Sequence, residues 1–198
     1  MSFLIGIDEA GRGPLAGPIA VGAFLISSPL ILKKFRGVKE SKQLSAEERE
    51  EWFEVINDLA LQGSVGYSVS FCQASSIDER GLTWAVNKSI DRCLKKLELV
   101  FGYSEKTTIK LDGLLHAPMR YKNQQTIIGG DDKVKVIALA SVCAKVLRDR
   151  KMKRLAEAYP EYGFDIHKGY GTKDHYRAIN MHGLCPEHRR SFLKNFVV

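Results

Sequence analysis

The sequence predicts an α/β fold, in which a mixed five-stranded sheet is flanked by helices and followed by a helical C-terminal extension. Two observations lead to this fold class. Five short apolar segments have the composition of strands, and the segments between them carry the apolar periodicity of helices. Strands that alternate with helices are typical of α/β domains. The 198 residues correspond to one domain with room for a small appendage, and they can bury a substantial core.

The expected strands cover residues 3–8, 19–27, 63–71, 108–111 and 125–128. A turn with three glycines and two prolines separates the first two strands, so we expect these strands to pair as an antiparallel hairpin. The later strands follow helical segments, and we expect them to join the sheet through helical crossovers.

Three helices are expected, over residues 45–61, 76–97 and 134–156. Ser45 followed by Glu48 forms the pattern of a capping box at the start of the first helix. The last helix is apolar in its first half, which we expect to be buried, and basic in its second half. Beyond Pro160 the chain is irregular, with one or two short helices expected. We therefore divide the chain into a domain of residues 1–157 and an extension of residues 158–198 that packs on it.

Composition argues against a membrane or secreted protein. No apolar run approaches the roughly 20 residues that a membrane span requires, and the first eleven residues lack the basic and apolar regions of a signal peptide. The four cysteines are widely spaced and form no C-x-x-C pair, as expected of reduced, buried thiols. We therefore expect a cytoplasmic protein, and because nothing indicates an obligate partner, we expect a monomer.

The positive charge is concentrated in the last quarter of the chain. Of the formal net charge of +7, residues 145–198 contribute +6, from 12 Lys and Arg against 6 Asp and Glu. A localised basic surface is typical of proteins that bind polyanions. A solvated helical surface would explain the same charge.

Acidic residues follow or end several of the expected strands. Asp8 and Glu9 close the first strand, Asp112 closes another, and Asp131 follows a third at the start of the long helix. The carboxyl ends of neighbouring strands are where open α/β sheets carry their sites, so these acids can converge. Converging carboxylates repel one another unless a divalent cation lies between them, and oxygen ligands suit Mg²⁺ or Mn²⁺.

Each acid also has a purely structural interpretation. An Asp before a glycine, as at Asp112, is often a turn former, and either Asp131 or Asp132 could be a helix N-cap. The pair Asp8 and Glu9 is harder to explain in this way, because two adjacent charges at the end of an apolar strand are costly unless they are solvated or bound to metal.

The turn after the first strand could contact a ligand. Gly11, Gly13 and Gly17 allow backbone amides to approach a phosphate or a sugar hydroxyl closely, and Arg12 adds a charge. The spacing matches neither a G-x-G-x-x-G fingerprint nor a P-loop, so a nucleotide cofactor is not expected. A tight hairpin turn would explain one or two of the glycines.

Six segments together resemble the type 2 ribonucleases H known as bacterial ribonuclease HII. The most specific is I-D-E-A-G-R-G-P-L-A-G-P at residues 7–18. The others are S-K-Q-L-S at 41–45, L-D-G at 111–113, G-D at 130–131 with A-S, A-K and R-D at 140–149, H-K-G-Y-G-T at 167–172 and H-R-R-S-F at 188–192. The resemblance spans residues 4–192. Glu40, where Asp is usual, and Leu139 and Cys143 depart from the family pattern without removing an acid.

The resemblance implies a ribonuclease H-like fold and four catalytic, metal-binding acids, which are Asp8, Glu9, Asp112 and Asp131. It implies that Gly11, Arg12 and Gly13 touch the ribose 2′-hydroxyl and the flanking backbone, and that Tyr170 packs on the sugar beside the scissile phosphate. Further substrate contacts are expected from the polar and basic side chains Ser41, Lys42, Lys145, Lys168, Arg189 and Arg190.

The expected substrate is an RNA–DNA hybrid or a DNA duplex that contains a ribonucleotide. Two Mg²⁺ or Mn²⁺ ions are expected across the scissile phosphate, with 3′-hydroxyl and 5′-phosphate products. Because the 2′-hydroxyl separates RNA from DNA, the glycine turn is the expected site of discrimination. The basic residues would contact duplex phosphates without reading sequence.

Three alternatives stay open from the sequence. The sister enzyme ribonuclease HIII normally has Thr in place of Arg12 and an extra N-terminal domain, for which we expect no room before the first strand. A non-catalytic nucleic-acid binder would use the basic tail and would not explain four acids in matching contexts. A zinc module could form from His182, Cys185 and His188, although no fourth ligand is evident.

Overall fold

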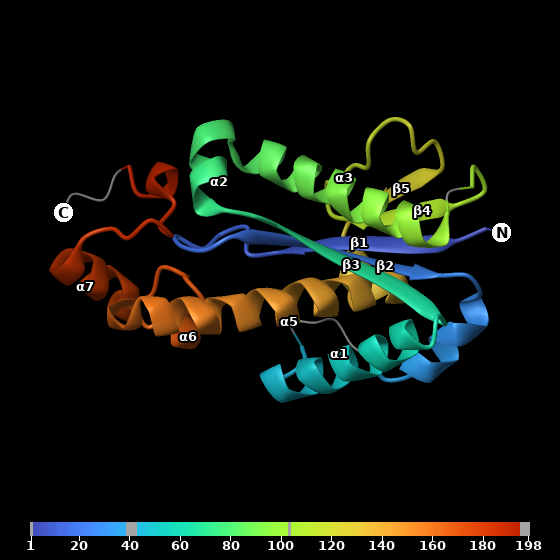
Figure 1. Cartoon of the computed structure of the whole chain (residues 1–198), viewed down its shortest axis with the longest axis horizontal. Coiled ribbons are helices and arrows are strands. Elements are labelled where there is room, and N and C mark those ends of the chain that lie inside the picture. The colour runs from blue at the N-terminus through green and yellow to red at the C-terminus, as the bar shows by residue number, and fades with distance from the viewer. Residues whose placement is uncertain (1, 39–42, 103, 195–198) are drawn as a thin grey trace.

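The computed structural model describes residues 2–38, 43–102 and 104–194, and its centre is a five-stranded mixed sheet (Figure 1). The strand order is β3-β2-β1-β4-β5, which confirms the predicted fold class. The strands are β1 Leu4–Ala10, β2 Ile19–Ile26, β3 Val65–Cys72, β4 Thr108–Asp112 and β5 Gln124–Ile127.

The first two strands form the expected antiparallel hairpin, in which Asp8 pairs with Gly22. β4 joins the other side of β1 in parallel, with Ile7 opposite Leu111, and β5 continues in parallel beside β4. The carboxyl ends of β1 and β4 therefore lie next to each other at one end of the sheet.

Helices cover both faces of the sheet (Figure 1). The long helix α5 runs along one face against β1 and β2, with α1 packed beside it, and α3 covers the opposite face. The α-helices are α1 Ala46–Leu61, α2 Ala74–Arg80, α3 Leu82–Phe101, α4 Gly130–Lys133, α5 Lys135–Ala158, α6 Phe164–His167 and α7 Lys173–His182. Shorter 3₁₀ turns lie at Pro29–Phe35, Pro160–Tyr162 and Arg190–Phe192. Within the described residues, no helix has both the length and the apolar character that a bilayer span requires.

Two expectations about the helices are wrong: that residues 76–97 form one helix, and that Asp131 lies at the start of the long helix. The helix expected over 76–97 is two helices, because Gly81 has φ +84° and ends α2 where α3 begins. The long helix starts at Lys135, after an extended Val134 (φ −129°), so that Asp131 lies in the separate short helix α4. By contrast, the capping box of α1 is confirmed, since Ser45 Oγ accepts from the Glu48 amide at 3.1 Å and Glu48 Oε2 accepts from the Ser45 amide at 2.6 Å.

Two glycines let α5 lie directly on the sheet backbone. A Cβ added to Gly6 would clash with the main-chain carbonyl of Val136, and one added to Gly22 would clash with that of Ala140. Gly22 lies in a strand that is apolar and buried throughout, and Gly6 lies between the buried side chains of Ile5 and Ile7. The close approach places Ser141 of α5 against Asp8, to which it donates a hydrogen bond.

The C-terminal extension packs on the end of α5 and on the turn between β1 and β2. Its apolar residues form a cluster with Leu15, Ala16 and Met152, and the cluster includes the stacked rings of Tyr162 and Phe164. The main chain is joined as well, because Gly169 O accepts from the amides of Leu15 and Ala16 at 2.8 and 3.2 Å. The extension is therefore part of the structure that shapes this turn.

Two buried histidines of the extension predict acid sensitivity. The Nε2 atoms of His175 and His188 lie 3.1 Å apart, and burial lowers the pKa of each imidazole to about 4. The unfolded chain takes up protons near pH 6.5 while the folded protein resists them, so the free energy of unfolding falls as pH falls below 6.5. We expect a loss of about 1–2 kcal/mol per imidazole between pH 6.5 and 5.

Urea unfolding at stepped pH between 7 and 5 measures this loss. His188→Gln, which removes one titrating group, should flatten the pH dependence relative to the unaltered protein. A free energy of unfolding that stays constant between pH 7 and 5 would contradict the expectation.

Candidate active site

Three aspartates converge at the end of the sheet. Asp8 comes from β1, Asp112 from the last position of β4 and Asp131 from α4, and one carboxylate oxygen of each lies within 4.8 Å of the others. The parallel pairing of β1 with β4 sets the first two side by side. The third is brought in because Asp112 Oδ1 accepts a 2.6 Å hydrogen bond from the amide of Gly130, at the start of α4.

The environment of Asp8 disfavours its charge in the absence of a cation. Its side chain is 5% exposed. Burial raises the pKa of the Asp8 carboxyl to about 8, and the neighbouring carboxylates of Glu9 and Asp112 add to this rise, while the hydrogen bond from Ser141 opposes it. A divalent cation would replace the proton and relieve the repulsion. The residues present therefore fit a site for an oxygen-ligated ion such as Mg²⁺ or Mn²⁺.

Glu9, the fourth acid of the sequence hypothesis, is not part of this cluster. Its Oε1 accepts from Arg12 Nε at 2.9 Å, and its Oε2 is buried and lacks a hydrogen-bond partner among the described residues. β1 extends to Ala10, so Asp8 and Glu9 lie within the strand and do not end it. Adjacent strand residues point to opposite faces, which separates the two side chains.

A cavity of about 260 Å³ lies beside the aspartates. It brings together Asp8 and Asp112 with five of the residues that the sequence assigned to the substrate: Gly11, Arg12, Gly13, Lys145 and Tyr170. Tyr170 is 45% exposed and leaves part of its ring open to a ligand. The glycine turn and two of the three clustered aspartates, Asp8 and Asp112, are therefore walls of one cavity.

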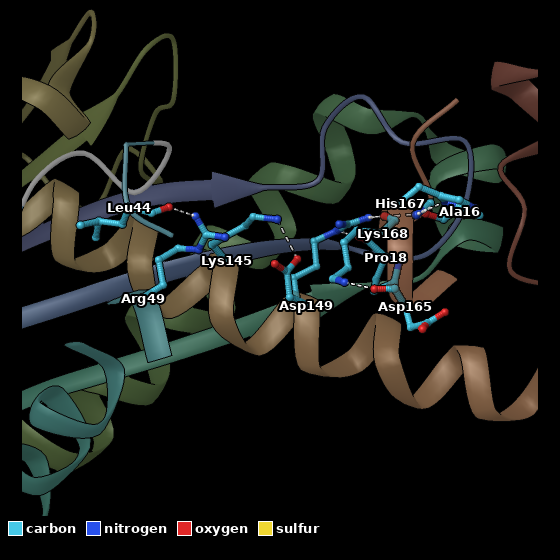
Figure 2. A network of polar contacts seen from close by, with 11 residues as sticks. Ala16, Pro18, Leu44, Arg49, Lys145, Asp149, Asp165, His167 and Lys168 are labelled. Carbon is cyan, nitrogen blue, oxygen red and sulfur yellow. Dashed lines mark hydrogen bonds and ion pairs between the residues drawn. The ribbon is translucent and has the colours of Figure 1, made fainter. Parts of the chain in front are cut away.

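Among the described residues, the other predicted contacts, Lys168, Arg189 and Arg190, do not line this cavity. Lys168 Nζ donates to the main-chain carbonyl of Asp165, and Arg190 is exposed at the surface. Lys145, which does line the cavity, pairs with Asp149 at 2.8 Å along α5, as Figure 2 shows. Ser41 and Lys42 fall outside the described residues.

Arg189 differs most from its expected role. It was expected to contact duplex phosphates, but its side chain is 0% exposed and its guanidinium donates to the main-chain carbonyls of Gly11, Arg12 and Gly17. Burial, with Arg148 nearby, lowers the pKa of Arg189 to about 9, so the side chain stays charged at neutral pH. A side chain enclosed in this way does not reach a phosphate.

Sequence reasoning gave no special weight to two further residues around the site. Arg148 is buried and donates through Nε to Pro18 O at 2.9 Å and through Nη2 to Lys168 O at 3.0 Å. Ser141 holds Asp8. The sequence contains a signal that Arg148 is buried. Ala140, Ala144, Arg148 and Met152 follow one another at four-residue spacing and therefore lie on one buried face of α5.

The zinc hypothesis is not supported. Across the described part of the chain, the three aspartates are the only group of three or more potential ligands close enough to share a metal ion. His188 Nδ1 instead accepts from the amide of Cys185 at 3.0 Å. Its other nitrogen faces His175.

Three aspartates clustered at one end of this mixed sheet, beside the parallel strands β1 and β4, are the arrangement of a metal-dependent nuclease with the ribonuclease H fold. The family model described as Ribonuclease HII matches residues 5–195. The chain belongs to the ribonuclease HII family, and is thus a type 2 ribonuclease H that acts on RNA–DNA hybrids and depends on divalent metal.

Curated relatives and solved structures agree with this assignment. Ribonuclease HII of Acetivibrio thermocellus is 40% identical over 99% of this chain and 72% of the relative, and that of Caldicellulosiruptor saccharolyticus is 40% identical over 98% and 89%. A PCNA:RNase HII complex from Archaeoglobus fulgidus contains a chain that is 26% identical with a TM-score of 0.73, over 98% of this chain and 95% of that one. Bst-RNase HIII in complex with Mn²⁺ is 25% identical with a TM-score of 0.70, over 96% and 64%.

Proposed function

We propose that this enzyme cleaves the RNA strand of RNA–DNA hybrids and also incises duplex DNA on the 5′ side of a single embedded ribonucleotide, leaving 3′-hydroxyl and 5′-phosphate ends. Its cellular role would be the removal of misincorporated ribonucleotides and RNA primers. The observation that carries the proposal is that the Gly11–Arg12–Gly13 turn lines one cavity together with Asp8 and Asp112, two of the three clustered aspartates. A ribose can thus be recognised next to the bond that is cut.

The acids would hold the metal, and their neighbours keep the acids in place. Two Mg²⁺ or Mn²⁺ ions, bound by Asp8, Asp112 and Asp131 with Glu9 at their edge, would activate the attacking water and offset charge on the leaving oxygen. Ser141 orients the Asp8 carboxylate by its hydrogen bond. Asp112 couples its own position to that of Asp131 through the amide of Gly130.

The turn and Tyr170 would select the ribose. A Cβ added to Gly13 would be 4.0 Å from Tyr170 Cε1, so the missing side chain leaves space between the turn and the ring. Backbone groups of the turn can exchange hydrogen bonds with a 2′-hydroxyl, which a deoxyribose lacks. The ring of Tyr170 offers an apolar surface against which a sugar can pack.

Duplex binding would come from basic groups around the cavity. Lys145 lies in the cavity wall, and Lys168 and Arg190 lie further along the extension, with Ser41 and Lys42 as further candidates. Phosphate contacts of this kind set affinity and salt dependence and carry no sequence information. In this scheme residues 1–157 form the catalytic domain, residues 158–198 supply Tyr170, and the enzyme acts as a cytoplasmic monomer.

A duplex with one ribonucleotide in otherwise all-DNA strands tests the proposal. With Mg²⁺ or Mn²⁺ we expect one incision on the 5′ side of the ribonucleotide and none in the all-DNA control. Cleavage restricted to runs of ribonucleotides would favour the specificity expected of ribonuclease HIII. Salt-sensitive binding without metal-dependent cleavage would show a binding protein and overturn the proposal.

Replacing Tyr170 by alanine should reduce the rate of cleavage while leaving the fold intact. The ring is half-exposed, so its loss removes little buried area, but it removes the surface proposed for the sugar. We expect about a 10²-fold loss of kcat/KM, as for misplacement of a reacting group. Single-turnover kinetics and thermal unfolding of the same samples separate the two effects.

Tyr170→Phe is the matched control, because it keeps the ring and should retain most of the rate. If Tyr170→Ala cleaves at the original rate, the role assigned to the ring is wrong.

A further inference from the structure

Arg189 is a buried cation that donates three hydrogen bonds, one from each nitrogen of its guanidinium, to main-chain oxygens of the turn that follows β1. Nη2 donates to Gly11 O at 2.8 Å, Nη1 to Arg12 O at 3.0 Å and Nε to Gly17 O at 3.0 Å. A buried charge is costly unless its donors are satisfied. Turning any of the three carbonyls away would leave part of the buried charge without a hydrogen bond, so the guanidinium keeps the carbonyls in this orientation.

These bonds determine how two peptide groups of the turn are oriented. In a trans peptide the C=O of one residue and the N–H of the next point in opposite directions. The carbonyls of Gly11 and Arg12 face inward to Arg189, so the amides of Arg12 and Gly13 face outward. The outward side is the cavity, which Arg12 and Gly13 line and Arg189 does not.

We infer that Arg189 is a positioning residue that sets the ribose preference of the enzyme, because it aims the amides of Arg12 and Gly13 into the active-site cavity. Neither amide donates a hydrogen bond within the described part of the chain. Two consecutive N–H groups that face the same space form a small concave donor site, which suits a hydroxyl or phosphate oxygen. The inference rests on the proposed function and assigns its selectivity to a residue that never touches the substrate.

The surroundings of Arg189 are built to hold it still. Its own amide donates to Leu15 O at 2.7 Å, and its guanidinium carbon lies 5.2 Å from the centre of the Phe192 ring. The residues that follow are fixed to α2, because the Asp78 carboxylate accepts from the amides of Arg190 and Ser191 at 2.8 and 2.9 Å. The C-terminal extension thus acts on the turn through a rigid connection.

A second buried arginine provides a matched control. Arg148 is also almost fully buried and also donates to carbonyls, but these belong to Ala16, Pro18 and Lys168. Its loss should disturb the same region and the stability of the fold to a similar degree. The loss of Arg148 should not change the orientation of the peptide groups between Gly11 and Gly13, because Arg189 still binds their carbonyls.

The test is competitive binding of two labelled duplexes that differ only in one ribonucleotide against one deoxyribonucleotide. The measurements are made with Mg²⁺ in the Asp8→Asn background, in which we expect cleavage to be too slow to consume the duplexes during the binding measurement. Because both duplexes compete for the same protein molecules, the ratio of their affinities does not depend on the folded fraction. We expect the ribose preference to fall about tenfold in Arg189→Gln, the effect of one well-oriented hydrogen bond.

Arg148→Gln should keep the preference of the Asp8→Asn parent within about twofold, and Arg189→Lys should restore part of it, since a lysine can still donate to one carbonyl. Arg189→Gln with the full preference of the parent would overturn the inference. An equal loss in Arg148→Gln would do the same, because general loosening of the turn would then be the cause. A parent with no ribose preference would instead overturn the proposed selection of ribose, and this inference with it.

Discussion

Asp8→Asn is expected to reduce cleavage by about 10³-fold or more, because the charge that the site directs at a divalent cation is worth several kcal/mol in the transition state. Asp8 is buried, whereas the other acids of the strands β1 and β4, Glu9 and Asp112, are partly exposed. Asp8 lies at the junction of β1, β4 and α5. Asparagine keeps the size of the side chain and its contact with Ser141. The loss is therefore expected in the rate of the chemical step, with duplex binding largely retained.

The same substitution should stabilise the metal-free protein. The folded state raises the pKa of Asp8 from 3.8 to about 8, so between these values the folded protein holds a proton that the unfolded chain releases. The free energy of unfolding therefore falls as pH rises through this window, and asparagine removes the fall. We expect a gain on the order of 5 kcal/mol at pH 8 without divalent metal, shrinking toward pH 4.

Asp132→Asn is the matched control for both measurements. Asp132 follows Asp131 directly but is exposed and outside the cluster, so its neutralisation should change neither rate nor stability appreciably. Single-turnover cleavage and urea unfolding in a chelator give the two readouts. A fully active Asp8→Asn protein would contradict the assignment of Asp8 to the metal site.

Gly6→Ala should destabilise the protein by about 3 kcal/mol or more, since overpacking that cannot relax through a side chain is at the upper end of such costs. The added methyl would clash with the main-chain carbonyl of Val136 and lie 2.5 Å from the amide nitrogen of Ile137. Only a displacement of α5 from the sheet relieves this contact. For a chain of this size we expect the melting temperature to fall by roughly 6–12 °C.

Gly37→Ala adds the same methyl group where nothing lies within 4 Å. It should cost only about 1–2 kcal/mol, for placing alanine at φ +96°. Thermal unfolding of both variants isolates the steric part of the effect. A Gly6→Ala protein no less stable than Gly37→Ala would show that α5 does not pack on the sheet as closely as described.

Local sequence determines most of the elements of this fold. Apolar segments, a capping box at Ser45 and a turn rich in glycine predict strands, a helix start and a hairpin because each depends on neighbouring residues alone. The errors fall where a single backbone angle decides. Gly81 at positive φ divides one expected helix into two, and Val134 in extended conformation separates α4 from α5.

The candidate site was partly predictable for a comparable reason. Asp8 lies near the carboxyl end of β1 and Asp112 is the last residue of β4, and parallel strands bring such ends together, so their convergence follows from the pattern. The place of Glu9 does not follow from it. The pairing of Glu9 with Arg12 depends on where β1 ends and on how the turn folds back. β1 ends at Ala10, two residues later than the sequence indicates.

The sequence by itself determined the chemical identity of the site, through acids and a glycine turn whose residue types suit metal and ribose. Only the tertiary structure decided what the basic residues do. Arg148 and Arg189 look like surface charges in the sequence, but α5 and the extension enclose them beneath the turn. A charge carries no local signal of its burial, because burial depends on which distant carbonyls the fold brings within hydrogen-bonding distance.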